Sequence, residues 1–327
     1  MTRVTVGGRL HVGFQNLSLA HNRLYGGVGI ALAAPRVDLH AERGDTIDCD
    51  DDAARPYVER VVDNLDVPGA TIRVAERLPR HAGLGSGTQL ALASLVGIAD
   101  AYDRAVDPRA FAPTLGRGGR SGIGVATFER GGFVVDGGHP TERFTTAPPA
   151  EGEWTVPPVV ARHSLPEDWR FVLVIPDAGP GRSGDEEDQS MRSVVERADP
   201  GIAEEISQLV TQQLLPAAAT GDRSAFGSAV ARLGRLNGAW YADEQGGVYR
   251  PPAGAIIDSL SAEPAVAGAG QSSWGPTVYA LTSADYAADV ADAARDALEA
   301  TGERGRVAVT QPRNHGATVR SGPSEDA

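Results

Sequence analysis

A glycine-rich segment at residues 83–88 constrains this chain more than any other part of its sequence. Three glycines and two hydroxyl side chains stand in six positions, directly before an Ala- and Leu-rich run of helix-forming composition. Such a loop turns several backbone N–H groups toward one point, and the following helix adds the positive end of its dipole. The segment therefore predicts a phosphate or pyrophosphate site formed by Gly83, Leu84, Gly85, Ser86, Gly87 and Thr88.

Neither of the two commonest phosphate signatures fits this loop. A Walker A loop requires Gly-Lys-Ser/Thr, and the chain contains no lysine. A dinucleotide fingerprint requires Gly-x-Gly-x-x-Gly after the first strand of a βαβ unit, and glycines at 83, 85 and 87 do not have that spacing. The alternative is a plain turn between a strand and a helix, which does not explain why Ser86 and Thr88 accompany the glycines.

Charge and composition exclude several classes of partner. The net charge is −13, and all 30 basic residues are arginine. An acidic surface repels nucleic acid and anionic membranes, so we expect small-molecule substrates. The acidity is typical of a halophilic archaeal protein of the cytoplasm, although a GC-rich genome explains the missing lysine equally well. Positive charge at an active site must come from arginine, histidine, a helix N-terminus or a metal ion.

Length and apolar content indicate a substantial core. The chain has 327 residues, of which 41% are hydrophobic, so there is room for two domains. The lack of an 18-residue apolar run leads us to expect neither a membrane span nor a secretory signal. Cys49 is the single cysteine, which excludes an intramolecular disulfide and a cysteine-based zinc cluster.

Hydrophobic patterning predicts mixed strands and helices in two halves. We expect strands at residues 4–6, 26–32, 36–41, 70–74, 169–176, 278–281 and 306–309, and helices at 57–65, 90–102, 202–216, 223–239, 254–260 and 284–300. A hairpin is expected over residues 127–136, with Gly131 and Gly132 as its turn. A connector-like stretch at 145–158 divides the chain into domains at 1–160 and 161–320, followed by a disordered tail at 321–327.

Two further glycine-bounded segments carry polar side chains suited to a small anion. The first lies near the N-terminus, and its candidate substrate-binding residues are Arg9, His11, Asn16, Arg23 and Tyr25. Taken alone, His11 is explained equally well as a core histidine. The second lies at residues 116–124, and its candidates are Arg117, Arg120 and Ser121. An ordinary surface turn with solvated arginines is the alternative for this second segment.

The loop resembles the Pro-x-x-x-Gly-Leu-Gly-Ser-Ser loop of the GHMP kinase superfamily, with a match from Pro79 to Ser86 and a departure at residues 87–89. Many of these kinases carry a catalytic aspartate where this chain has Gly124. Residues 268–277 resemble the third motif of the superfamily, whose backbone helps bind phosphate across the domain cleft. That resemblance implies further phosphate-binding residues at Gly270, Gln271, Ser272 and Ser273.

Taken together, the segments are more similar to one branch, the β-ribofuranosylaminobenzene 5′-phosphate synthases, than to the kinases. They are residues 8–11, 23–29, 81–89, 116–124 and 270–277. The resemblance implies an α+β fold of two domains, with a ribosomal-S5-like N-terminal half and a ferredoxin-like C-terminal half. It also implies a pentosyltransferase that joins phosphoribosyl pyrophosphate to 4-aminobenzoate with loss of carbon dioxide and pyrophosphate, an early step toward methanopterin-type carriers.

This implied reaction assigns roles to several residues. Mg²⁺ would assist the glycine loop, with Ser86 or Thr88 as a ligand, and Arg9, Arg23 or Arg120 would hold the carboxylate or the 5-phosphate. Carbon dioxide leaves in place of a proton, so a glycine at 124 is expected. An ATP-dependent small-molecule kinase is the second hypothesis, and a non-enzymatic nucleotide-binding protein is the third. A homodimer is a further expectation.

Overall fold

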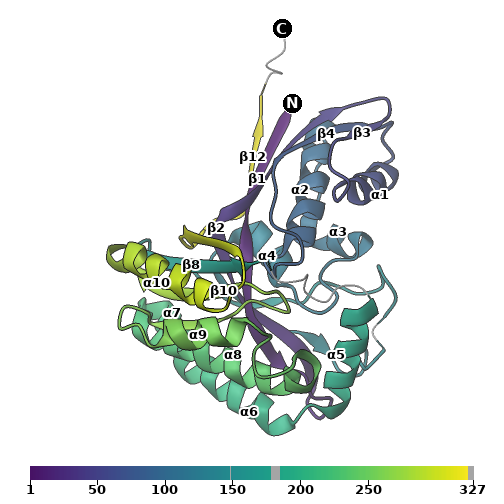
Figure 1. The fold of residues 1–327 in the computed structure, drawn as a ribbon. Helices are drawn as coiled ribbons and strands as arrows, with labels where there is room; N and C mark the ends of the chain where they lie inside the picture. Colours follow the sequence, from purple (N-terminus) through teal and green to yellow (C-terminus); the bar gives the residue numbers. More distant parts are fainter. Residues whose placement is uncertain (148, 178–184, 323–327) are drawn as a thin grey trace.

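Two mainly antiparallel sheets organise the chain (Figure 1). The computed structural model describes residues 1–147, 149–177 and 185–322. The first sheet has eight strands in the order β12-β1-β2-β4-β3, with β5 and β6 paired to β2 and β7 paired to β5. Its strands are β1 (Thr2–Asn16), β2 (Arg23–Arg43), β3 (Ile47–Cys49), β4 (Ala70–Glu76), β5 (Phe133–Asp136), β6 (His139–Pro140), β7 (Val159–His163) and β12 (Thr318–Ser321).

The second sheet lies in the C-terminal half. It has four strands in the order β11-β8-β10-β9. They are β8 (Trp169–Pro176), β9 (Gly268–Gln271), β10 (Val278–Ser283) and β11 (Gly305–Thr310). The predicted strands at 169–176, 278–281 and 306–309 are therefore confirmed.

Helices cover both sheets. In the N-terminal half they are α1 (Arg55–Leu65), α2 (Ser86–Ala101), α3 (Pro108–Phe111), the 3₁₀ turn η1 (Ala112–Leu115) and α4 (Ile123–Arg130). The C-terminal half contains α5 (Asp185–Arg197), α6 (Pro200–Leu209), the π-helical turn η2 (Val210–Leu214), α7 (Leu215–Thr220), α8 (Arg223–Gln245), α9 (Ala253–Ser261), the 3₁₀ turn η3 (Ala284–Tyr286) and α10 (Ala287–Ala300). Helix α2 packs on β1 and β2, whereas α9 and α10 pack on the second sheet.

Two local predictions were wrong. Residues 127–130 belong to helix α4 and not to a hairpin, because Ile123, Ala126 and Thr127 share one buried helical face. Gly131 and Gly132 do turn the chain, with φ values of 61° and 81°, but they join a helix to a strand. The predicted strands at 26–32 and 36–41 are one strand, β2, and a break in its register with β1 accommodates the intervening residues.

One of the hydrophobic clusters spans the two halves, and each half has a further cluster of its own. Leu10 and Ile30 of the first sheet belong to the same buried cluster as Phe171 of the second. Strand β12 returns the chain to the first sheet, where Ser321 pairs with Thr2, and residues 323–327 of the expected tail lie outside the described residues. This shared core fixes the loops of both halves against one another.

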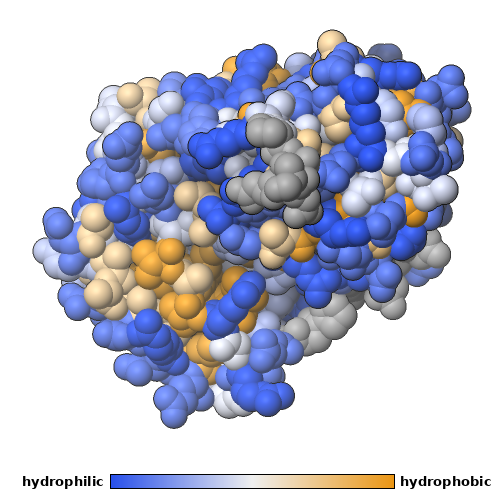
Figure 2. Space-filling model, turned by 90° about the horizontal axis from the view of Figure 1, so that it is seen from above, coloured by the Kyte–Doolittle hydropathy of each residue, from blue (hydrophilic) through white to orange (hydrophobic). Residues whose placement is uncertain are grey.

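Hydrophilic residues cover much of the surface (Figure 2). Figure 2 shows a largely hydrophilic face with one concentrated apolar area. In the part of the chain that the structure describes, no helix is both long and apolar enough to cross a membrane.

Candidate active site

The glycine loop connects β4 to α2 in a conformation that requires glycine. Gly83 and Gly85 have φ values of 81° and 80°, in the left-handed region that favours glycine. A Cβ on Gly83 would stand 2.1 Å from the carbonyl oxygen of Ser272. Gly85 is the N-cap of α2, and no side chain caps this helix with a hydrogen bond.

The carbonyl groups of the loop are held on its inner side. The Gly83 carbonyl accepts hydrogen bonds from the Arg9 guanidinium and from the Ser272 hydroxyl, the latter at 2.7 Å. The Leu84 carbonyl accepts from the Arg9 backbone N–H at 3.0 Å. Residues 85–88 line a cleft, so the first-turn N–H groups of α2 stand at its wall without a capping side chain. An uncapped helix N-terminus of this kind suits an anion.

This phosphate cleft has a volume of about 440 Å³ and a basic lining. Its cationic side chains are Arg9, Arg77, Arg80 and Arg117, with His81 beside them. The Arg117 guanidinium lies 5.0 Å from the ring centroid of Tyr57, and it also donates a hydrogen bond to the Tyr57 hydroxyl. A Cβ on Gly87 would lie 3.2 Å from an Arg117 nitrogen. Arginine therefore supplies, at the loop itself, the charge that a lysine supplies in other phosphate loops.

The segment at 270–277 packs against the phosphate loop. The Ser272 hydroxyl accepts from the His11 N–H at 3.0 Å while it donates to Gly83. A Cβ on Gly275 would lie 2.2 Å from the Ala82 carbonyl carbon, so the two backbones touch. Ser273 lines the cleft.

Three of the four residues implied in this segment have structural contacts instead. Ser272 is fully buried and its hydroxyl braces the loop. The Gln271 side chain accepts from the Arg250 N–H at 2.9 Å and donates to the Ser273 carbonyl at 3.0 Å. Gly270 lies within β9. Of the four, only Ser273 is a lining residue of the phosphate cleft.

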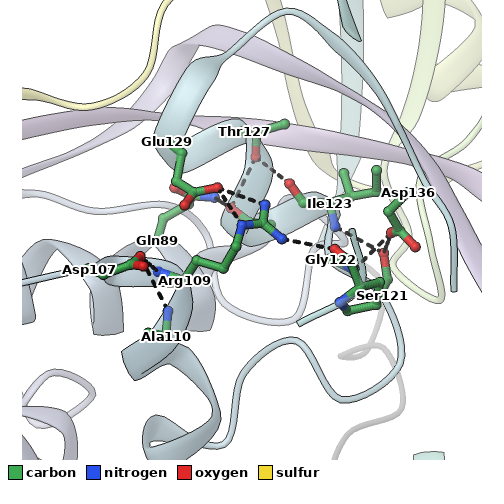
Figure 3. Close-up of polar contacts among 12 residues, drawn as sticks. Gln89, Asp107, Arg109, Ala110, Ser121, Gly122, Ile123, Thr127, Glu129 and Asp136 are labelled. Atoms are coloured by element: carbon green, nitrogen blue, oxygen red, sulfur yellow. Dashed lines mark hydrogen bonds and ion pairs between the residues drawn. The ribbon is translucent and has the colours of Figure 1, made fainter. Parts of the chain in front are cut away.

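Two of the predicted substrate-binding residues, His11 and Ser121, are distant in sequence and in contact in the fold. His11 Nε2 lies 3.2 Å from Ser121 Oγ, which donates to the Asp136 carboxylate at 3.2 Å. Figure 3 shows Ser121 and Gly122 converging on Asp136. Burial lowers the pKa of His11 to about 3, with Arg9 adding to the shift, so this imidazole is neutral at physiological pH.

Asp136 is a site residue that the sequence alone did not reveal. Its carboxylate accepts from the Gly122 N–H at 2.8 Å and from the Gly138 N–H at 2.9 Å. Burial raises the pKa of Asp136 to about 6, although these donors act in the opposite direction. The carboxyl group thereby fixes Ser121 beside His11.

Asn16, Arg23 and Tyr25 lie away from the phosphate cleft. The Asn16 amide donates to the carbonyls of Ser18 and Arg23 and closes the turn between β1 and β2. The Arg23 guanidinium donates to the carbonyls of residues 137 and 138. Tyr25 is buried and packs between aromatic rings. Of the three, Arg23 supports the turn that directly follows Asp136, the last residue of β5.

Arg120 is also separated from Arg9 and Arg117. It forms an ion pair with Asp188 of α5 and is not among the lining residues of the cleft. Two arginines three positions apart in the sequence thus face different surroundings.

Gly124 stands against the phosphate loop. A Cβ there would lie 3.0 Å from the Thr88 methyl group, and the Gln89 side chain donates to the Gly124 carbonyl at 2.9 Å. Helix α4 is held in place by the ion pair between Arg109 and Glu129 at 2.7 Å (Figure 3). No carboxylate is among the described residues that line the cleft, so a base of the kinase type is missing where it would act.

Several cleft residues went unassigned from the sequence. They are Tyr57, Arg77, Arg80, His81 and Trp274. Arg77, Arg80 and His81 lie within six positions before Gly83, and this closeness in sequence could have identified them as cleft residues. Tyr57 was not recognisable, because it reaches the loop from α1 through the fold.

Known proteins match this chain along nearly its whole length. The family models "GHMP kinases N terminal domain" and "GHMP kinases C terminal" match residues 53–132 and 214–300. A β-ribofuranosylphenol 5′-phosphate synthase of Methanothermobacter thermautotrophicus is 33% identical, over 94% of this chain and 95% of that protein. The protein of the same name from Archaeoglobus fulgidus is 33% identical, over 98% and 99%.

Solved structures show the same fold at low sequence identity. Mevalonate kinase of L. major, in complex with R-mevalonate, has a TM-score of 0.66 at 15% identity and covers 94% of this chain and 95% of its own. Mevalonate diphosphate decarboxylase of Staphylococcus aureus has a TM-score of 0.65 at 12% identity, with coverage of 98% and 99%. The expected two-domain α+β fold is confirmed.

The names of the relatives specify a phenol where the sequence resemblance implied an aminobenzene. They name synthases and not kinases, in agreement with Gly124 at the position of the kinase aspartate. The chain therefore belongs to the β-ribofuranosylphenol 5′-phosphate synthase family, within the GHMP kinase superfamily.

Proposed function

We propose that this protein is a decarboxylating phosphoribosyltransferase that joins phosphoribosyl pyrophosphate to a ring carbon of a 4-substituted benzoate. The observation that supports it most strongly is the uncapped start of α2 between Arg9 and Arg117, in a chain related to synthases that make a ribofuranosylphenol phosphate. The product belongs to the route toward methanopterin-type carriers.

The leaving pyrophosphate occupies the phosphate cleft at the first turn of α2. Backbone N–H groups of residues 86–88 and the Arg117 guanidinium stabilise the charge that develops as the C1′–oxygen bond breaks. Arg9 holds the loop carbonyls on the opposite side, so the donors are oriented before the substrate arrives. Preorganised donors of this kind contribute most when they need no rearrangement during the reaction.

The 5-phosphate occupies the outer, basic extension of the cleft. Residues 77–82 form one wall of this extension, and Arg306 of β11 lies on the other. Arg77, Arg80 and His81 belong to both the extension and the phosphate cleft. Asp177 also lines the extension, but arginines predominate among the charged residues of the two spaces, and this suits a substrate with phosphate groups at both ends.

The acceptor is 4-hydroxybenzoate, because the relatives' names specify a phenol product. The para hydroxyl donates electron density to the carbon that bears the carboxylate, and this carbon attacks C1′. The C1′–oxygen bond breaks and its electron pair leaves with pyrophosphate. The bond to the carboxylate then breaks, its electron pair restores the aromatic ring, and carbon dioxide departs. No proton is removed from the ring, in agreement with Gly124.

Mg²⁺ fits this site as an ion carried by the substrate. The described lining contains the hydroxyls of Ser86 and Thr88 and no carboxylate, whereas protein Mg²⁺ sites usually include one or two carboxylates besides substrate phosphates. Pyrophosphate oxygens would supply most of the ligands, and one of the two hydroxyls would complete the set. The ion would supply charge neutralisation for the departing pyrophosphate.

Release of labelled carbon dioxide tests the reaction. The purified chain is incubated with phosphoribosyl pyrophosphate, Mg²⁺ and carboxyl-labelled 4-hydroxybenzoate. In one parallel reaction 4-aminobenzoate replaces 4-hydroxybenzoate, and in another ATP replaces phosphoribosyl pyrophosphate. We expect carbon dioxide and pyrophosphate in equal amounts, with 4-hydroxybenzoate as the better acceptor. ATP-dependent phosphorylation of an alcohol without carbon dioxide release would contradict the proposal.

A further inference from the structure

A second, smaller cavity adjoins the phosphate cleft. It lies between β1, helix α8 with the turn that follows it, and the loop after β9. Ser273 and Trp274 line both spaces and form the boundary between them. The cavity volume is about 40 Å³, which is room for about three water molecules, so a benzene-sized ring enters only when lining side chains move apart.

Aromatic rings form much of the wall of this aromatic pocket. The rings of His11 and Phe14 meet edge to face with centroids 4.7 Å apart. The rings of Tyr241 and Trp274 are 4.5 Å apart and tilted by 56°. Rings arranged in this way offer both faces and edges to an inserted aromatic ring.

The aromatic pocket differs from the phosphate cleft in charge. None of its described lining residues is an arginine, aspartate or glutamate. His11 is the one titratable cation on the lining, and burial keeps it neutral. The Asn237 side chain is fully engaged, because it accepts from the Phe14 N–H at 2.7 Å and donates to the carbonyls of Phe14 and Leu233.

One polar atom on the lining has no partner among the described residues. The Tyr249 hydroxyl is buried and makes no hydrogen bond. A Cβ on Gly234, another lining residue, would lie 3.7 Å from it. Leaving a buried hydroxyl without a partner is energetically costly, so a ligand that supplies the partner gains affinity there.

We propose that the aromatic pocket is the acceptor subsite, in which the benzoate ring lies among Phe14, Tyr241 and Trp274 and its para substituent meets the Tyr249 hydroxyl. This inference rests on the proposed function for the identity of the ligand. The reacting carbon then faces the boundary at Ser273, toward the ribose in the phosphate cleft.

This placement also accounts for the loss of the carboxylate. The acceptor carboxylate, on the reacting carbon, lies at the boundary between the two spaces, and no guanidinium belongs to the described lining of the aromatic pocket itself. Leaving as neutral carbon dioxide removes a poorly solvated charge. The two phosphate groups of the other substrate, in contrast, face arginines.

Two helix glycines provide a matched test. Gly234→Ala adds a methyl group beside the Tyr249 hydroxyl, inside the pocket. In Gly254→Ala the methyl group lies 3.7 Å from Tyr249 Cβ, and Gly254 is not a lining residue. Both changes favour the helix, so neither is expected to unfold the chain. Dissociation constants for 4-hydroxybenzoate, benzoate and phosphoribosyl pyrophosphate are measured by calorimetry on the full chain, with pyrophosphate present for the two benzoates.

We expect Gly234→Ala to weaken 4-hydroxybenzoate binding about 10-fold and to change phosphoribosyl pyrophosphate binding less than twofold, while Gly254→Ala changes neither. Tyr249→Phe should remove most of the preference for 4-hydroxybenzoate over benzoate. If Gly234→Ala leaves the dissociation constant for 4-hydroxybenzoate unchanged, or weakens the binding of both substrates equally, the proposed acceptor subsite is wrong.

The subsite and the reaction can fail separately. If the wild type binds 4-hydroxybenzoate, Gly234→Ala does not, and no carbon dioxide forms with phosphoribosyl pyrophosphate, the subsite is supported and the reaction is wrong. If carbon dioxide forms and acceptor constants are unchanged in Gly234→Ala, the reaction is supported and the subsite is wrong.

Discussion

The phosphate cleft and the aromatic pocket share a wall at Ser273 and Trp274, yet their linings differ in charge. The cleft is lined by the glycines and first-turn backbone of the phosphate loop and by arginines, together with apolar side chains such as Leu78 and Leu90. The pocket is lined by aromatic rings, glycines and uncharged polar side chains, and it carries no formal charge on its described lining. The comparison teaches that one small boundary separates a polyanion site from a site for a flat ring, so each substrate finds a suitable environment on only one side.

The largest expected effect comes from a substitution that disrupts the phosphate cleft and leaves the aromatic pocket unchanged. In Gly85→Val a β-branched side chain must adopt φ near 80° and meets Arg9 Cγ at 3.0 Å. This displaces the first turn of α2 and should lower kcat/KM for phosphoribosyl pyrophosphate more than 100-fold, as loss of a preorganised anion site does. Gly302→Val is the matched control, since Gly302 has a φ of 74° with open space around it. An active Gly85→Val variant would contradict the assignment.

The second effect concerns Arg117, whose guanidinium stacks on Tyr57 beside Gly87. Arg117→Ala should raise KM for phosphoribosyl pyrophosphate about 30-fold and leave the acceptor KM within twofold. Arg117→Lys should recover only part of the loss, because lysine can neither stack nor donate as a planar fork. Arg120→Ala, three positions away and outside the cleft, should behave like the wild type. A larger effect at Arg120 than at Arg117 would reverse our assignment of the two arginines.

A change at the shared wall should affect both sides. Trp274 is 9% exposed and borders both spaces. Trp274→Ala should raise KM for each substrate about 10-fold, whereas the variants above affect one substrate only. Steady-state kinetics with each substrate varied in turn measure this. If only one constant changed, the two spaces would not share this wall in solution.

The cleft was predictable from sequence and the pocket was not. Residues 83–88 are consecutive, so their glycine spacing and hydroxyls are visible in the chain itself. The pocket combines Phe14 of β1, Gly234 and Tyr241 of α8, and Trp274, and only the fold brings them together. Arg9 and His11 were identified as candidates, but their partners at Gly83 and Ser121 depend on the same long-range packing.

Two differences between the sequence patterns and the structure have similar physical causes. Asn16 and Arg23 are polar and glycine-bounded, like binding residues, yet their donors go to backbone carbonyls of a turn and of residues 137–138. The turn expected at Gly131 and Gly132 indicated a hairpin over residues 127–136, but tertiary packing against α2 and β2 makes residues 127–130 helical. Local pattern does not distinguish a side chain that binds substrate from one that holds a loop.

A last expected effect concerns the free energy of unfolding and not activity, and it involves Asp136, which holds Ser121 beside His11. Because burial raises the pKa of Asp136 to about 6, the native state retains a proton between pH 4 and 6 that the unfolded chain has released. The contribution of Asp136 to the free energy of unfolding is therefore present below pH 4 and is lost as the pH rises through 6, by at most about 3 kcal/mol.

Denaturant unfolding of the wild type and Asp136→Asn at pH 4, 5, 6 and 7 measures this contribution. The difference between wild type and variant should fall as the pH rises and then level off above pH 6 to 7. A difference that increases over this range would mean that the carboxylate is stabilised, and not destabilised, by its surroundings.

A crystal structure of the chain with pyrophosphate, Mg²⁺ and 4-hydroxybenzoate tests the central claim most directly. We predict pyrophosphate oxygens about 3 Å from the backbone nitrogens of residues 86–88, and the benzoate ring beyond Trp274 near the Tyr249 hydroxyl. Pyrophosphate bound elsewhere, or a ring lying among the arginines with the aromatic pocket collapsed, would contradict the division of the site into a charged and an uncharged half.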